Sequence, residues 1–372
     1  MPQSSGNPPV AGQVVGQSAL RIWSLTSDER LRRQLQRAGA TADAADARHV
    51  VVLRADWVYD DPFVRGLVAR TAPCAMWSEE GCVALVVVPS RVAEAVVLLA
   101  QGRAPEDLPR VAPQEIAGSY NDKLRKREPP FLLPLTAQQL PAIEKRVFAG
   151  SYKGVTDFVT LSWPKAVSGV TRVCANLGMT PNMVTSVSLM MTLLATWLFW
   201  HGHYGIGLIA AWLMAFLDSV DGKLARVTLT YSKFGDLFDH LIDLIHPPFW
   251  WWAWIVGLSA VQLPLSWAGL ALGIIVVGYV LQRLEEGLFI SRFKMDMHVW
   301  QRFDSRFRLV TARRNPNLAI LTVATLAGRP DWGIGAVAIW TAVSLLIHAL
   351  RLLQAALARR RGKLQSWLAA PT

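Results

Sequence analysis

Cysteine is scarce in this sequence, and no group of cysteines has the spacing of a metal site. The chain has 372 residues and three cysteines, Cys74, Cys82 and Cys174. An odd number of cysteines without metal-ligand spacing is typical of reduced, structural thiols. The first twenty residues also lack a basic stretch followed by an apolar core, so we expect no secretory leader and a front region that stays in the cytosol.

Charged residues are nearly absent from long stretches after Met183. About 20 apolar residues in a helix span the ~30 Å hydrocarbon core of a bilayer. The predicted spans are 183–201, 204–225, 234–257, 266–290, 317–329 and 333–353. The 16 tryptophans agree with this, because tryptophan favours the membrane interface. We therefore predict a multi-pass integral membrane protein with an all-α bundle of six transmembrane helices.

Lysine and arginine are missing from two of the predicted loops, at 201–205 and 258–266, whereas the loop at 291–316 and the tail after residue 355 are rich in them. Basic residues collect on the cytoplasmic side of membrane proteins. We therefore expect both termini in the cytosol and the spans in the inner (cytoplasmic) membrane. The net charge of +11 is then a topology signal and an attraction to lipid headgroups, and we expect no nucleic-acid partner.

Four carboxylates lie where a membrane span should have none. Asp218 and Asp221 fall three apart near the end of the second span, and Asp239 and Asp243 fall four apart near the start of the third. Each spacing puts a pair on one helix face. Counting about 1.5 Å per residue from each span end places all four at one depth, just inside the cytoplasmic leaflet. The alternative is that they are ordinary charges in a soluble loop.

Clustered carboxylates need positive compensation, and they form a hard oxygen site that suits Mg²⁺ or Mn²⁺. Nearby in the sequence, Lys223 and Arg226 are the obvious counter-charges. The small residues of this segment let a ligand approach the backbone, and an arginine fork suits a phosphate. We therefore predict a diphosphate-binding site with room for a nucleobase, formed by Gly222, Ala225, Arg226 and Gly235.

These residues form a motif: Asp218-x2-Asp221-Gly222-x2-Ala225-Arg226-x8-Gly235-x3-Asp239-x3-Asp243. It resembles the signature of the CDP-alcohol phosphotransferases without a departure in residue or spacing. The segment TPNMVT at 180–185 also resembles the entry segment of that family, and 164–177 its interfacial helix. The resemblance implies a six-helix bundle, a homodimer, and two divalent ions in a cytoplasm-facing cavity.

By this resemblance Asp218, Asp221 and Asp239 hold metal, and Asp243 is the general base and an additional metal ligand. The implied reaction moves a phosphatidyl-type group from a CDP-alcohol, such as CDP-diacylglycerol, to an acceptor hydroxyl and releases CMP. An alternative within the family is transfer of a CDP-linked headgroup to diacylglycerol or ceramide. A transporter would have polar residues spread over several spans, and an inactive scaffold could have lost an aspartate.

Residues 18–150 alternate between strand and helix patterns, which predicts a cytosolic α/β, Rossmann-like domain. The strands are predicted at 19–23, 49–56 and 83–88. The segment at 50–64 resembles the strand of sugar-nucleotide transferases that carries a metal-binding aspartate, here Asp56. The Gly-rich phosphate loop of those enzymes is missing, so we expect a degenerate nucleotidyltransferase-like domain.

The remaining regions are a flexible N-terminus at 1–17, a linker with an amphipathic helix at 151–182, the six-span domain at 183–355 and a basic tail at 356–372. The α/β domain beside a transferase domain resembles fusions that act on inositol phosphate. This favours a phosphopolyol acceptor, with Lys233, Arg292 and Arg302 as candidate acceptor-binding residues. Their alternative role is that of positive charges in cytoplasmic loops.

The charge asymmetry of the loops gives a first testable prediction. Reporter fusions at residues 1 and 372 should both report a cytoplasmic location, because the basic loop and tail resist translocation. Fusions in the loops at 201–205 and 258–266 serve as the matched outer positions. An external location of either terminus would invalidate the topology together with the estimate of carboxylate depth.

Overall fold

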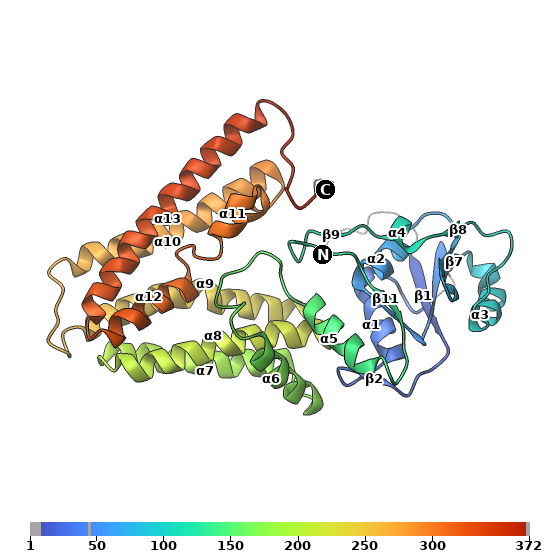
Figure 1. The fold of residues 1–372 in the computed structure, drawn as a ribbon, viewed down its shortest axis with the longest axis horizontal. Helices are drawn as coiled ribbons and strands as arrows, with labels where there is room; N and C mark the ends of the chain where they lie inside the picture. The colour runs from blue at the N-terminus through green and yellow to red at the C-terminus, as the bar shows by residue number, and fades with distance from the viewer. Residues whose placement is uncertain (1–8, 44–45, 370–372) are drawn as a thin grey trace. The chain divides into compact units, whose positions relative to one another are not determined.

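The computed structural model describes residues 9–43 and 46–369 and divides into two compact units. The α/β unit comprises Met1–Lys123, Arg127–Tyr152 and Arg226–Leu229, and the helical unit comprises Leu124–Lys126, Lys153–Ala225 and Thr230–Thr372. This division confirms the predicted fold class of an α/β domain together with an α-helical membrane part (Figure 1).

The α/β unit contains a five-stranded sheet in the order β1-β4-β7-β6-β8. Its strands are β1 (Val10–Val15), β4 (His49–Arg54), β6 (Cys74–Ser78), β7 (Gly81–Val87) and β8 (Arg110–Val111). β1 pairs with β4, and β6 with β8, in parallel, whereas β7 is antiparallel to both of its neighbours.

Helices cover both faces of this sheet. Successive side chains of a strand point to opposite faces, so alternate residues of β4 enter two different cores. Val51 and Leu53 of β4 pack in one core with α1 (Ser27–Ala38) and α2 (Asp61–Ala69). Val50 and Val52 of the same strand pack in a second core with α3 (Val92–Ala100). The buried run of valines in β4 thus follows from its two covered faces.

The expected strand at 19–23 forms only in part and lies outside the five-stranded sheet. Only Arg21–Ile22 form a strand there, β2, and it pairs with β3 (Leu25–Thr26) in a separate hairpin. The first strand of the sheet is instead β1, inside the stretch that we predicted to be flexible; residues 1–8 of that stretch lie outside the described residues. Gly12 interrupts the apolar pattern of β1, and a Cβ at that position would lie 2.8 Å from Cδ1 of Leu35 on α1, so Leu35 packs closely against the main chain of β1.

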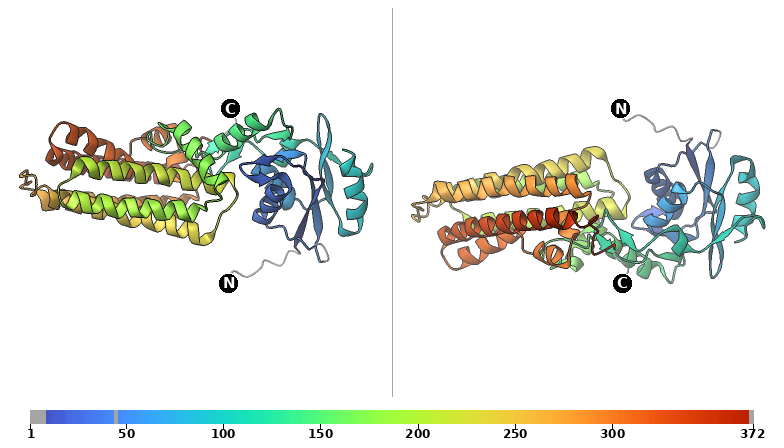
Figure 2. Two further views of the ribbon diagram at one scale, coloured as in Figure 1. Left: turned by 90° about the horizontal axis from the view of Figure 1, so that it is seen from below. Right: turned by 90° about the horizontal axis from the view of Figure 1, so that it is seen from above.

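The helical unit contains an N-terminal helix, α6 (Pro164–Asn176), followed by the long helices of the bundle. These are α7 (Pro181–Trp200), α8 (Tyr204–Val227), α9 (Lys233–Gly257), α10 (Ala268–Phe293), α12 (Arg314–Leu326) and α13 (Pro330–Arg359). α7 packs on α9, and α13 packs on α10 and α12 (Figure 2). Between α10 and α12 lie η2 (Met297–Val299) and α11 (Arg302–Phe307).

The shorter elements complete the described chain. They are β5 (Trp57–Tyr59), β9 (Tyr120–Asn121), β10 (Lys126–Arg127), β11 (Leu132–Pro134), η1 (Pro89–Arg91), α4 (Pro113–Ile116) and α5 (Leu140–Gly150).

Four helices of the described chain are long and apolar enough to cross a membrane: α7, α8, α10 and α13. Helices α9 and α12 form at the two remaining predicted places. α9 carries charged residues through its first half, and the 13 residues of α12 reach only about 20 Å. The structure therefore confirms membrane-spanning helices, while a total of six spans stays a prediction.

Candidate functional site

Three of the four predicted aspartates meet in the helical unit. Carboxylate oxygens of Asp218 and Asp221 on α8 and of Asp239 on α9 lie within 4.8 Å of one another. Asp221 is the most enclosed of them, with 4% of its surface exposed. Three convergent carboxylates provide only oxygen ligands, which is the donor set that Mg²⁺ and Mn²⁺ prefer.

The fourth aspartate, Asp243, joins this group through an arginine from α12. The Nη1 of Arg314 donates to Oδ1 of Asp243, and its Nη2 donates to Oδ2 of Asp218 at 2.7 Å. The Nε of Arg314 donates to Oδ1 of Asn315 at 3.0 Å. All three nitrogens of one guanidinium are thus engaged, and its charge partly balances the carboxylates of α8 and α9.

Arg314 is itself held in place from the start of the helical unit. The amide nitrogen of Asn315 donates to Oδ1 of Asp157 at 3.1 Å, and the same oxygen accepts from the backbone N–H of Thr160. Asp157 and Asn315 are both buried. Hydrogen bonds between side chains therefore hold the first turn of α12 against the segment that contains Asp157.

The start of α7 supports the carboxylates from the other side. Oγ1 of Thr185 donates to Oδ2 of Asp221 at 2.6 Å. A Cβ added to Gly235, near the start of α9, would lie 2.4 Å from Oδ1 of Asn182. Gly235 thus allows α9 to approach α7 closely, which is the role that the motif residue plays in the fold.

For the other predicted site residues, the structure gives a position on a helix, and this position alone assigns no role. Gly222, Ala225 and Arg226 follow Asp221 on α8, with Arg226 in the last turn. Lys233 is the first residue of α9, and its side chain lies outside what the structure describes.

The two remaining acceptor candidates are exposed. Arg292 lies in the last turn of α10, and the guanidinium of Arg302 lies 5.4 Å from the ring centroid of Trp367. Within the described residues, neither makes a hydrogen bond or ion pair with the four aspartates. Their role in acceptor binding stays a prediction.

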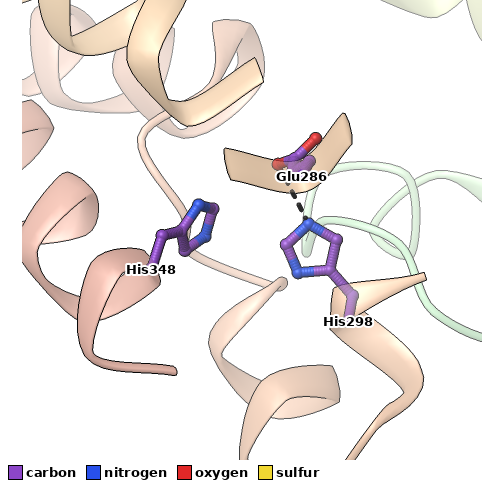
Figure 3. Close-up of side chains that lie close together, drawn as sticks. All are labelled: Glu286, His298 and His348. Carbon is purple, nitrogen blue, oxygen red and sulfur yellow. Dashed lines mark hydrogen bonds and ion pairs between the residues drawn. The ribbon is translucent and has the colours of Figure 1, made fainter. Parts of the chain in front are cut away.

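A second group of possible metal ligands comprises Glu286 on α10, His298 in η2 and His348 on α13 (Figure 3). Two guanidiniums already contact its carboxylate: Nη2 of Arg313 and Nη2 of Arg283, the latter 3.1 Å from Oε1 of Glu286. The Nε2 of His298 lies 3.2 Å from the same oxygen, and burial lowers the pKa of this histidine although Glu286 acts in the opposite direction. Positive charge therefore already compensates Glu286, and the group disfavours a further cation.

Arg314 is the functional residue that sequence reasoning missed. It lies 71 residues from Asp243 and 96 from Asp218 in the chain, within a loop whose arginines are already explained by membrane topology. The signal available was its position directly before an apolar helix, next to Asn315. Thr185 was also overlooked as a partner of Asp221, although it belongs to the TPNMVT segment.

Comparison with known proteins places this site within a known domain. Residues 178–348 match the family model described as CDP-alcohol phosphatidyltransferase. This range contains all four aspartates, the motif glycines and Arg314.

Three similar proteins match parts of the chain. An archaetidylinositol phosphate synthase of Pyrococcus horikoshii is 44% identical over 69 residues, covering 18% of this chain and 37% of that protein. A cholinephosphotransferase 1 of Xenopus laevis is 30% identical over 126 residues, covering 30% of each chain. A CDP-diacylglycerol–serine O-phosphatidyltransferase of Helicobacter pylori is 38% identical over 68 residues, covering 18% of this chain and 27% of that protein. The chain thus spans between about a quarter and two fifths of these relatives.

The bridging arginine generates a prediction that separates charge from packing. We expect Arg314→Gln to lower the melting temperature in chelator, since hydrogen bonds to charged groups contribute about 1.5–3 kcal/mol each. We also expect Mn²⁺ to bind the variant more tightly, because a competing positive charge beside the carboxylates is gone. Thermal unfolding and Mn²⁺ titration by electron paramagnetic resonance measure the two effects.

The matched control is Arg302→Gln, which removes an exposed arginine that stacks on Trp367. It should leave both the melting temperature in chelator and the Mn²⁺ affinity close to those of the wild type. An Mn²⁺ affinity that falls in the Arg314 variant would contradict the proposed competition.

Proposed function

We propose, from the match of residues 178–348 to the CDP-alcohol phosphatidyltransferase family model, that this chain transfers a substituted phosphate group from a CDP-alcohol to an acceptor hydroxyl and releases CMP. The observation that carries the proposal is the convergence of Asp218, Asp221 and Asp239 within 4.8 Å. The family motif and this oxygen-lined cluster fall on the same residues.

Asp218, Asp221 and Asp239 would hold divalent metal, either Mg²⁺ or Mn²⁺, with two ions expected and Asp243 as a further ligand. Their all-carboxylate donor set fits such ions. A bound divalent ion supplies Lewis-acid polarisation of the diphosphate and charge stabilisation for CMP as it leaves. Gly222, Ala225, Arg226 and Gly235 would hold the CDP-alcohol, with Arg226 as the fork for phosphate.

Asp243 would be the general base. Its carboxylate lies outside the group formed by the other three aspartates and is oriented by Arg314. The proton of the acceptor hydroxyl passes to Asp243, and the acceptor oxygen forms a bond to the phosphorus that bears the alcohol. The bond from that phosphorus to the oxygen shared with the second phosphate breaks, and its electron pair leaves with CMP.

A lipid donor such as CDP-diacylglycerol and a phosphorylated polyol such as inositol phosphate are the substrates that we propose. One relative is named for an inositol phosphate product. In addition, Arg308 is buried, and its Nε and Nη1 have no hydrogen-bond partner within the described residues. A buried guanidinium with open donors suits a phosphate group. Lys233, Arg292 and Arg302 remain further candidates for binding the phosphate of the acceptor.

A second candidate is the transfer of a CDP-linked headgroup, such as CDP-inositol or a CDP-aminoalcohol, to diacylglycerol or ceramide. This second reaction is supported by the similarity of the chain to a cholinephosphotransferase over 126 residues. The two reactions use the same phosphorus chemistry and differ in which substrate carries the lipid. A transporter or an inactive scaffold has less support, since the carboxylates gather in one place and all four are retained.

We propose that the α/β unit is a degenerate nucleotidyltransferase that does not itself make a CDP-alcohol. The candidate metal ligand Asp56 is engaged by Arg54, whose Nε and Nη2 lie 2.9 and 2.6 Å from its carboxylate oxygens. The loop after β1 contains a single glycine, Gly16, before β2 begins. Such a loop offers little of the close backbone approach that a Gly-rich phosphate loop provides.

We propose further that the enzyme is a homodimer in the inner membrane with its termini and active site facing the cytosol. The four apolar helices make it a membrane protein. The basic loop and tail supply the orientation, because the excess of lysine and arginine marks the cytoplasmic side.

The metal requirement can be tested with the full chain in lipid nanodiscs. With Mn²⁺ or Mg²⁺, CDP-diacylglycerol and inositol phosphate, we expect release of CMP, and we expect excess chelator to abolish it until metal is restored. Replacing these two substrates with a CDP-aminoalcohol and diacylglycerol tests the second candidate reaction, which then releases CMP instead. Full turnover in excess chelator, or no CMP from any pair of substrates, would refute the proposal.

The division of roles among the aspartates predicts different defects for two matched variants. Asp243→Asn should abolish transfer but bind metal and donor nearly normally, because a general base contributes about 10²–10⁴-fold to the rate. Asp218→Asn should weaken metal binding as well, since a hard cation loses one of its few anionic oxygens. Mn²⁺ and CDP-lipid titrations decide the matter; equal losses of metal affinity in the two variants would show that the roles are wrong.

A further inference from the structure

Two consecutive prolines, Pro247 and Pro248, lie inside α9, directly after the segment that carries Asp239 and Asp243. A proline inside a helix has no N–H to donate to the carbonyl four residues earlier. The carbonyls that lose this partner are those of Asp243 and Leu244. One of them belongs to the residue that we propose as the general base.

A tyrosine from the neighbouring helix reaches these two carbonyls. The hydroxyl of Tyr279, on α10, donates to the carbonyl oxygen of Leu244 at 3.0 Å and lies 3.4 Å from that of Asp243. Tyr279 is half-buried, and α10 packs against α9. The single hydroxyl hydrogen of Tyr279 therefore replaces one of the two N–H groups that the prolines removed, mainly at Leu244, and its oxygen stays near the carbonyl of Asp243. Polar backbone groups in a membrane need such a partner within the protein.

We infer that Tyr279 is a positioning residue for Asp243. This inference rests on the proposed function, in which Asp243 takes the proton of the acceptor. Arg314 holds the carboxylate of Asp243, and Tyr279 holds the main chain at Asp243 and Leu244, with the shorter hydrogen bond to Leu244. A base held at both ends keeps its oxygen within reach of the acceptor hydroxyl, and a misplacement of about 1 Å can cost about 10²-fold in rate.

The chain offers a matched control in a second tyrosine that donates to α9. The hydroxyl of Tyr204 donates to the carbonyl oxygen of Trp254 at 2.8 Å, near the opposite end of the helix. Tyr204 is buried, so its removal should destabilise the protein at least as much. Tyr204 is the first residue of α8, 14 residues before Asp218. Within the described residues it makes no hydrogen bond to Asp243.

The contact is tested first without reference to activity. Tyr279→Phe should lower the melting temperature of the full chain in nanodiscs. The same substitution in a Pro247→Ala, Pro248→Ala background should lower it by less, because the restored N–H groups bond the two carbonyls. Non-additivity of this kind is the signature of coupled residues. An equal loss in both backgrounds would overturn the inference.

The positioning role is tested by kinetics with the same proteins. Tyr279→Phe should lower kcat about tenfold or more and leave the KM for the CDP-lipid within about twofold, since the donor site is not altered. Adding the two proline substitutions should recover most of this loss. Tyr204→Phe should lower the melting temperature and leave kcat within about twofold.

The remaining outcomes separate this inference from the proposed function. If the two tyrosine variants lose kcat equally, or if the loss lies in KM, Tyr279 supports the fold only and the inference is wrong. If the wild-type chain releases no CMP from any substrate pair, the proposed function fails, and the positioning role fails with it. The melting cycle still decides whether the hydroxyl replaces one of the missing N–H groups.

Discussion

The helical unit depends on one constraint: four carboxylates, one of them buried and three half-buried, crowd together between apolar helices. Like charges in a medium of low dielectric constant repel, and removing them from water is costly unless a partner compensates. Arg314 supplies that partner inside the protein: its three nitrogens bond Asp218, Asp243 and Asn315, and so link α8, α9 and α12. The short helix α12 thereby supplies the positive charge that compensates the carboxylates of the longer helices α8 and α9.

Close approach of the helices follows from the same site. Gly235 leaves no room for a side chain against Asn182, and Thr185 from α7 donates to Asp221. The residues that hold the carboxylates in place therefore come from α7 and α12 as well as from the two helices that carry the motif. A metal or diphosphate site of this kind needs support around its ligands, because an unsupported carboxylate would turn toward solvent.

The sequence predicted the helices and the carboxylate cluster well, for physical reasons that operate locally. Apolar runs define helix ends within a few residues, and the spacings of three and four place Asp218 with Asp221 on one face. Arg314 could not be found in the same way, because its partners lie 71 and 96 residues away and topology already explained its charge. In the α/β unit, Gly12 interrupts the apolar pattern of β1, and the segment predicted as a strand at 19–23 forms only the two-residue strand β2 outside the main sheet. The turn of the β2–β3 hairpin places Trp23 and Ser24 at positive φ. Such turns favour glycine and asparagine, so tryptophan and serine at these positions do not predict one.

Arg313 and Arg314 are adjacent in the chain, yet their guanidiniums contact acidic residues on different helices. Arg313 is the N-cap of α12 in an extended conformation, and Arg314 is the first helical residue, so that the two side chains diverge. One contacts Glu286 on α10, and the other contacts the aspartates of α8 and α9. These contacts on two sides fix the rotation of α12 about its own axis. A shift of the chain by a single residue would put one arginine in the place of the other and leave one of the two acidic groups without its partner. The length of the loop from η2 to α12 is therefore constrained.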